Sequence, residues 1–201
     1  DTILFVQAEE MLGDARLQVS NHRRRHALKH YNKPAGWRIV SLSPPRPDGK
    51  LTVLTPEFAG AMEPCLSFDA KKLVFAYSKK GTTSTRIYEM GIDGTGVRQL
   101  TLNDNAGYHD MDPCYMPDGN IMFSSTRCGQ TVDCNWVEVS NLYLMDGEGR
   151  FMRRVGFDQV HTIFPTVTDD GRVLYTRWEY TDTTLWHIQS LWTTNQDGTD
   201  T

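Results

Sequence analysis

Three evenly spaced histidines form the first group in this sequence that could bind a metal ion. His22, His26 and His30 lie four residues apart in a basic segment, and on a helix they would stack on one face. Two histidines at that spacing can ligate one ion, because neutral imidazole is a common metal ligand. Arg24 and Arg25 stand where a zinc-protease motif needs its glutamate, so that chemistry is not expected. The alternative is a solvated basic segment that docks on an acidic partner, on propionates or on phosphates.

Four cysteines are a second source of chemistry. Cys128 and Cys134 are six residues apart, a spacing at which they could form a disulfide, bind a metal or remain thiols. Cys65 and Cys114 each directly follow a proline. We expect both to be small buried side chains, because free cysteine is among the most buried residue types.

The segment Arg177-Trp178-Glu179-Tyr180 combines aromatic and charged side chains, and we expect it to contact a partner such as a sugar or a peptide. The alternative is that its rings pack against a neighbouring element. Gly-rich phosphate loops, the GxSxG nucleophile motif and the CxxCH haem motif are absent from the sequence. The chain therefore contains no complete catalytic constellation, and its sequence alone assigns it no enzymatic activity.

The elements that must position these residues repeat about every 50 residues. Each unit opens with a short strand after a proline and passes through a tight turn into a second strand. A third strand follows and ends in a glycine turn. The prolines Pro64, Pro113 and Pro165 are separated by 49 and 52 residues. The glycines of these turns are Gly94, Gly149 and Gly198, and they are separated by 55 and 49 residues.

This period is typical of a β-propeller blade, a four-stranded antiparallel sheet whose faces are buried only by neighbouring blades. No helical periodicity is sustained along the chain. We therefore predict an all-β protein, a β-propeller that forms a partial ring, with the first strand of each blade starting at its proline. The expected divisions are a partial blade over 1–55 with a long inserted loop at 7–36, complete blades over 56–101 and 102–155, and a partial blade over 156–201.

The long connections of such a blade emerge on one face of the propeller, which we call the loop face. They join the second strand to the third, as at 7–36, 126–140 and 177–189, and the fourth strand to the next blade. Long loops on a rigid scaffold often carry functional residues. All six histidines fall in these connections: His22, His26, His30, His109, His161 and His187. Histidine is polar, however, and polar residues favour loops without any functional reason.

Composition limits the classes of function. The 201 residues include 21 basic and 25 acidic side chains, a formal net charge of −4, which argues against a general nucleic-acid surface. An apolar fraction of 39% with 23% charged residues is typical of a globular domain. The mean hydropathy of −0.48 leaves no run near the roughly 18 apolar residues of a membrane span.

Two stretches resemble one known family more closely than they resemble a generic propeller. Asp110 to Cys128 reads DMDPCYMPDGNIMFSSTRC, and Pro165 to Asp182 reads PTVTDDGRVLYTRWEYTD. With NLYLMDGEG between them, they resemble the propeller region of hydrazine synthase alpha subunits and their relatives, within the TolB-like class of repeat propellers. The similarity extends over nearly the whole chain.

The resemblance implies an extracytoplasmic scaffold, in a periplasm or an organelle lumen, that is part of a longer chain. Its loop face would hold a partner domain, a divalent metal such as zinc, or a haem. Covalent haem would be attached only in adjoining domains, because this chain lacks CxxCH. Within the resemblance, the residues expected to contact such a metal are His109, Asp110, Cys128 and Cys134.

The resemblance also implies partners. The remaining blades or domains of a longer chain and other protein subunits are expected, whereas nucleic acid is not. One alternative is a TolB-like module that binds a glycan, a peptide or a protein without redox chemistry. Another is an accessory propeller of a hydrolase, as in enzymes that resemble prolyl oligopeptidase.

Overall fold

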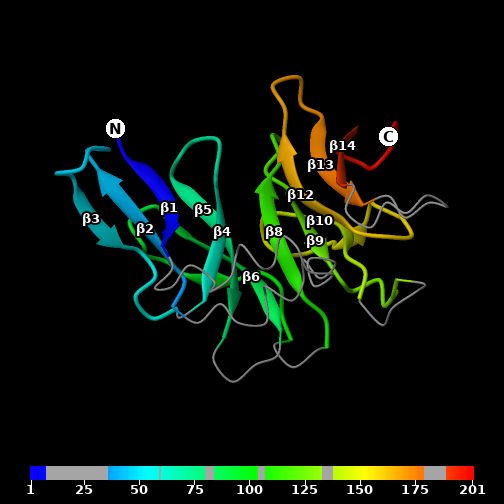
Figure 1. Cartoon of the computed structure of the whole chain (residues 1–201), viewed down its shortest axis with the longest axis horizontal. Coiled ribbons are helices and arrows are strands. Elements are labelled where there is room, and N and C mark those ends of the chain that lie inside the picture. Colours follow the sequence, from blue (N-terminus) through cyan, green and yellow to red (C-terminus); the bar gives the residue numbers. More distant parts are fainter. Residues whose placement is uncertain (8–35, 59, 80–83, 104–106, 133–137, 179–188) are drawn as a thin grey trace.

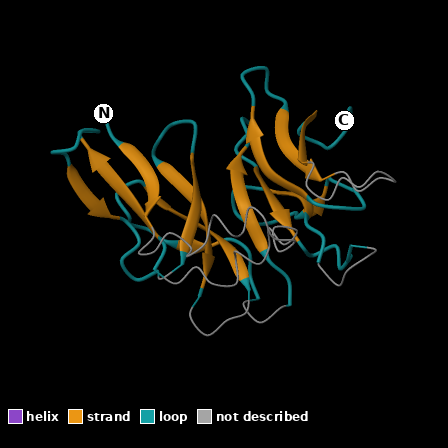
Figure 2. Ribbon diagram, in the orientation of Figure 1, coloured by secondary structure: helices purple, strands orange, loops and turns teal. Residues whose placement is uncertain are grey.

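All regular elements that the structure describes are β-strands (Figure 2). The structure is a computed structural model and describes residues 1–7, 36–58, 60–79, 84–103, 107–132, 138–178 and 189–201. Within those ranges no helix occurs, and hence none that could span a membrane. The strands are rich in β-branched and aromatic residues, which fit a pleated and half-buried surface. The prediction of an all-β protein is confirmed.

The described strands form four antiparallel sheets in chain order (Figure 1). The first contains β1 (Ile3–Gln7), β2 (Arg38–Ser43) and β3 (Lys50–Val53). The second contains β4 (Ala61–Leu66), β5 (Lys72–Ser78), β6 (Thr85–Gly91) and β7 (Arg98–Gln99). The third contains β8 (Asp110–Tyr115), β9 (Ile121–Ser125), β10 (Asn141–Met145) and β11 (Arg153–Arg154). The fourth contains β12 (Thr162–Val167), β13 (Val173–Trp178) and β14 (Gln189–Thr194).

The four sheets are propeller blades, and they follow one another in an open arc. Figure 1 shows the first blade at one end of the arc and the fourth at the other, with β4 and β8 near its middle. Strand β8 contacts β4 on one side and β12 on the other, so the first strands of successive blades are neighbours. The described strands do not close into a ring, which confirms the prediction of a partial propeller.

The first strand of each complete blade starts earlier than expected and contains its proline. Strand β4 begins at Ala61, and its pairing with β5 shifts register between Met62 and Cys65. Proline has no N–H to donate to a β-ladder, so it is tolerated at a bulge. The same register shift surrounds the proline in β8 and β12. The residue before each proline has a positive φ, of 57°, 50° and 57°: Glu63, Asp112 and Phe164.

The apolar core lies between the blades, because each blade buries its faces against its neighbours. One cluster joins the second and third blades and includes Met62, Ile87, Met111 and Phe123. A second joins the first and second blades, and a third joins the third and fourth.

The glycine turns that end the third strands approach the preceding blade closely. Gly149 has a φ of 77°, and a Cβ atom there would lie 2.4 Å from the carbonyl oxygen of Leu100. At Gly198 the corresponding distance is 2.2 Å to the oxygen of Val155. Glycine is required at these two turns both for its backbone conformation and for this contact between blades.

Candidate functional site

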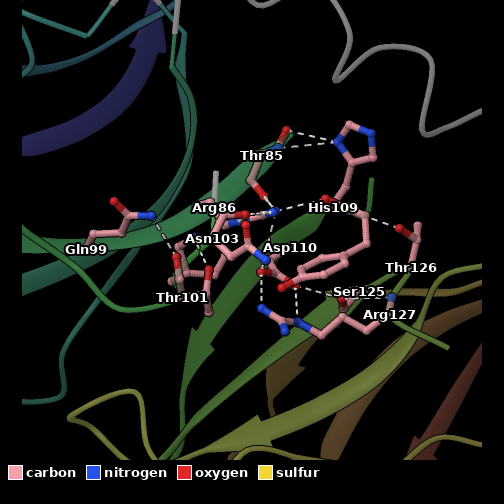
Figure 3. A network of polar contacts seen from close by, with 12 residues as sticks. Thr85, Arg86, Gln99, Thr101, Asn103, His109, Asp110, Ser125, Thr126 and Arg127 are labelled. Carbon is pink, nitrogen blue, oxygen red and sulfur yellow. Dashed lines mark hydrogen bonds and ion pairs between the residues drawn. The ribbon is translucent and has the colours of Figure 1, made fainter. Parts of the chain in front are cut away.

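Asp110, predicted as a metal ligand, lies at the start of β8 in a buried network of polar contacts (Figure 3). Its side chain is 0% exposed. Arg127 donates from Nε and Nη2 to the two carboxylate oxygens at 2.8 and 2.7 Å, and Ser125 Oγ donates to Oδ1 at 2.7 Å. A bidentate arginine pair is among the strongest hydrogen-bonded contacts of a carboxylate. Both oxygens of Asp110 therefore already have cationic partners.

Arg86, at the start of β6, brings a second guanidinium to Asp110. Its side chain is 1% exposed, and its Nη1 lies 3.8 Å from Oδ2 of Asp110. Nη1 also donates to the backbone oxygens of Thr85 and Tyr108 at 2.6 and 2.8 Å, and Nε donates to that of Asn103 at 3.1 Å. These contacts join a strand of the second blade to the connection that leads into the third.

The ring of Tyr108 lies against both guanidinium groups. The Cζ atoms of Arg86 and Arg127 are 4.4 and 4.1 Å from its centroid, within the range of a cation–π interaction. Burial lowers the pKa of Arg127, but the hydrogen bonds and the charge of Asp110 outweigh it, so the pKa is raised overall. The network thus holds buried charged groups by pairing them.

His109, the other predicted ligand at this point, acts as a hydrogen-bond acceptor between blades. Its Nδ1 accepts the backbone N–H of Thr85 at 3.3 Å, and the backbone N–H of His109 donates to Thr126 Oγ1 at 2.9 Å. Burial lowers the pKa of His109, the charge of Arg86 lowers it further, and Asp110 opposes both. The imidazole is therefore neutral near pH 7, with its proton on Nε2 because Nδ1 accepts.

His161 repeats this contact one blade later. Its Nδ1 accepts the backbone N–H of Ser140 at 3.1 Å, just as His109 accepts that of Thr85. Its ring stacks on Trp178 with centroids 5.6 Å apart. Two histidines 52 residues apart thus hold the third strand of one blade to the start of the next. This repetition gives both a role in blade packing.

Cys128 lies in a small apolar cluster. Its thiol donates to the carbonyl oxygen of Val139 at 3.1 Å, and it packs against Val132, Val160 and Trp178. Among the residues that the structure describes, no three His, Cys, Asp or Glu side chains are grouped as a metal site would require. Four of the predicted ligands lie outside the described residues: His22, His26, His30 and Cys134.

The predicted partner segment begins inside a strand. Strand β13 extends through Arg177 and Trp178, which were expected in a loop. Trp178 is buried against His161, as in the packing alternative, because the strand continues far enough to turn its ring into the blade interface. Arg177 pairs with Asp158 at 3.0 Å, and its guanidinium lies 4.6 Å from the centroid of Trp192. Glu179 and Tyr180 lie outside the described residues.

Sequence reasoning did not single out Arg86, Tyr108 or Arg127, which complete the network around Asp110. One signal was available: the third strand of the second blade contains two charged residues, Arg86 and Glu89, although strands between blades are mostly apolar. A buried arginine needs a carboxylate or several carbonyl oxygens. The sequence does not show which carboxylate pairs with it.

Comparisons with known proteins agree with this architecture, although no family model matches the chain. A stretch of 68 residues, 34% of the chain, is 44% identical to hydrazine synthase subunit alpha from Kuenenia stuttgartiensis, of which it spans 8%. The solved hydrazine synthase from the same organism matches 98% of the chain with a TM-score of 0.76 at 22% identity. The matched region is 30% of that longer chain.

A TolB-like protein from Agrobacterium tumefaciens also has this fold. It matches 81% of the chain, over 54% of its own length, with a TM-score of 0.63 at 21% identity. The blades, their register and these similarities lead to one conclusion. The chain has a β-propeller fold like that of the TolB-like protein, and it resembles part of the hydrazine synthase alpha subunit.

Proposed function

We propose that this chain is a non-catalytic propeller scaffold whose loop face holds an adjoining domain of a longer extracytoplasmic protein. The observation that carries the proposal is the mismatch in length: 98% of this chain aligns with only 30% of the hydrazine synthase chain. As one part of a longer chain, the propeller would present surfaces to the other parts. Its open edges and its loop face are the surfaces available for that contact.

The contacts between blades support a rigid platform. Besides the network at Asp110, Glu89 of the second blade accepts a hydrogen bond from Tyr115 of the third at 2.8 Å. Arg98 joins Glu89 at 2.7 Å to Glu148 of the third blade at 2.6 Å. Polar pairs on both sides of one interface fix the relative rotation of two blades, which an apolar interface alone specifies less strictly. A rigid array of blades suits a scaffold.

Exposed apolar side chains at equivalent positions support the loop face as the contact surface. Leu102 and Phe157 are 69% and 75% exposed, and both follow the fourth strand of a blade. The residue after each of them contacts the end of a strand that borders this face. Asn103 accepts a hydrogen bond from Arg86 of β6, and Asp158 forms an ion pair with Arg177 of β13. Exposed apolar residues that recur at one place in successive blades fit a protein surface that is covered by a partner.

The proposed location and cofactor rest on the resemblance. An extracytoplasmic location is proposed because the chain resembles TolB-like proteins and hydrazine synthase. A covalent haem would belong to the adjoining domain and would face the propeller, because the sequence has no CxxCH motif, whereas a divalent metal would be bound at the loop face itself. Within the chain, Cys128 remains a candidate ligand, together with Cys134, which lies outside the described residues.

The contact can be tested in the protein expressed at its natural full length. We expect Leu102→Asp and Phe157→Asp to speed backbone amide exchange at least tenfold in the domain that adjoins the loop face, since a buried charge would weaken the contact. Phe68→Asp is the matched control, because Phe68 is 67% exposed in the turn between β4 and β5, on the opposite face. Equal exchange in all three variants would refute the proposed contact.

The cofactor part has its own test. Elemental analysis and an absorption spectrum of the same full-length protein would show a bound metal or the Soret band of a haem. If neither is present, the cofactor part of the proposal is wrong while the scaffold part stands. That result would favour the TolB-like alternative, a non-redox module that binds a glycan, peptide or protein, which the similarity to a TolB-like structure supports.

A further inference from the structure

Cys65 and Cys114 occupy equivalent positions on the first strands of neighbouring blades. Each directly follows the bulge proline of its strand, β4 or β8, and they are 49 residues apart in the sequence. Their sulfur atoms lie 3.9 Å apart and share a hydrogen bond. In each strand the cysteine is the residue at which pairing with the second strand resumes after the register shift.

The two thiols differ in access. Cys114 is 5% exposed, whereas Cys65 is only partly buried. The hydrogen bond that Cys65 shares with Cys114 lowers the pKa of Cys65, burial opposes this, and a hydrogen bond to the backbone of Tyr115 lowers the pKa further, to about 7. The hydrogen bond with Cys65 raises the pKa of Cys114, and burial raises it further. Cys65 is thus the thiol that solvent reaches and that forms a thiolate near neutral pH, as an attacking cysteine must.

We propose that Cys65 and Cys114 are a redox-active thiol pair that closes to a disulfide between the second and third blades. The sulfur atoms are already 3.9 Å apart and must approach to the bond length of about 2.05 Å. The bond would join two strands on the inner side of the arc, where the blades are otherwise held by non-covalent contacts alone in the described residues.

Closure proceeds by exchange with an external disulfide, either a small molecule or a protein. The thiolate of Cys65 attacks one sulfur of that disulfide, so a mixed disulfide forms and one thiolate leaves. Cys114 then loses its proton and attacks the sulfur of Cys65, and the second thiolate leaves. The two protein thiols are oxidised, the external disulfide is reduced to two thiols, and these take up the two protons that the cysteines release.

The bond is detectable by peptide mapping without any variant. The natural full-length protein is folded, incubated in glutathione disulfide, and its remaining thiols are alkylated before digestion with trypsin. Cys65 lies in the tryptic peptide 51–71 and Cys114 in the peptide 99–127, whereas Cys128 and Cys134 share the peptide 128–150. We expect peptides 51–71 and 99–127 to appear joined, with a mass two hydrogens below their sum. A Cys128–Cys134 disulfide would stay within one peptide and cannot be confused with it.

The variants add a second measurement. Cys65→Ser and Cys114→Ser each abolish the joined peptide, while Cys128→Ser retains it. Oxidation should raise the melting temperature of the wild-type protein and of Cys128→Ser by roughly 5–10 °C, since closing a loop of this length restricts the unfolded chain. It should leave the melting temperature of Cys65→Ser unchanged. If folded wild-type protein keeps peptides 51–71 and 99–127 separate and alkylated after oxidation, the proposal is overturned.

Discussion

The backbone N–H of Asp112 donates a 2.8 Å hydrogen bond to the carboxylate of Glu63, its equivalent one blade earlier. The carboxylate of Asp112 in turn accepts the backbone N–H of Phe164 at 3.2 Å, at the equivalent position one blade later. All three residues precede a bulge proline and have a positive φ. The bulge frees these N–H groups from the ladder of their own blade, and an acidic side chain of the preceding blade accepts them. Phe164 has no carboxylate with which to continue this series.

Replacement of Asp112 by alanine should weaken the contact between the third and fourth blades. Loss of the acceptor leaves the N–H of Phe164 without this bond, and alanine is disfavoured at a φ of 50°. We expect the free energy of unfolding to fall by about 2–3 kcal/mol, measured by urea denaturation. Asp112→Asn keeps an acceptor and tolerates the backbone, so its loss should stay below about 1 kcal/mol. Equal losses in the two variants would contradict this assignment.

The approach of Gly149 to Leu100 can be separated from its backbone conformation. Gly149 and Gly119 have similar positive φ values of 77° and 85°. A Cβ atom at Gly149 would meet the oxygen of Leu100 at 2.4 Å, whereas one at Gly119 would have no neighbour within 4 Å. We expect Gly119→Ala to cost about 1 kcal/mol and Gly149→Ala at least about 2 kcal/mol more in thermal or urea unfolding. A similar cost for both would show that blade contact at this turn is unimportant.

The pair formed by Arg127 and Asp110 should be strongly coupled. Arg127→Met removes two hydrogen bonds from a fully buried carboxylate and leaves Arg86 as the nearest cation. We expect the free energy of unfolding to fall by roughly 3 kcal/mol. Adding Asp110→Asn should restore part of that loss, because the uncompensated charge is removed. A double-mutant cycle measures the coupling, and strictly additive losses would argue against the pair.

His109 should make the protein less stable in mild acid. Burial and Arg86 hold its pKa in the folded state below the unfolded value of about 6.5. The unfolded chain therefore binds the proton more readily, so stability is greatest above pH 6.5 and is lost as the pH falls toward the folded pKa. His109→Asn keeps an acceptor for the N–H of Thr85 and removes this titration. Urea unfolding at pH 7.5 and 5.5 should show a smaller loss in the variant than in the wild type, and an equal loss would refute the role of His109.

Cys128→Ser tests whether this cysteine has a role beyond packing. The serine hydroxyl can still donate to the carbonyl oxygen of Val139, so the fold should be retained. If Cys128 binds a metal or pairs with Cys134, the variant should retain less metal in elemental analysis or change its mobility on a non-reducing gel. The wild-type protein run under reducing conditions is the control for the change in mobility. No change in either measurement would leave Cys128 a packing residue.

The strand plan of this protein could be predicted from the sequence because it depends on local signals. Turn residues such as Asp118 and Gly119 set the hairpins, and the spacing of the bulge prolines marks the blades. The exact strand ends could not be predicted as well. Strand β4 starts three residues before Pro64, because the bulge lets the ladder resume on its other side. Strand β13 likewise runs on to include Trp178.

The candidate site depended on the tertiary structure. The sequence by itself determined that His109 and Asp110 would lie where one blade leads into the next, but not that Arg86 and Arg127 would meet there. It likewise placed Cys65 and Cys114 at equivalent positions without showing that their sulfur atoms touch. Both contacts depend on how far one blade is rotated against its neighbour. That rotation results from the packing of whole sheets, which no local pattern of residues specifies.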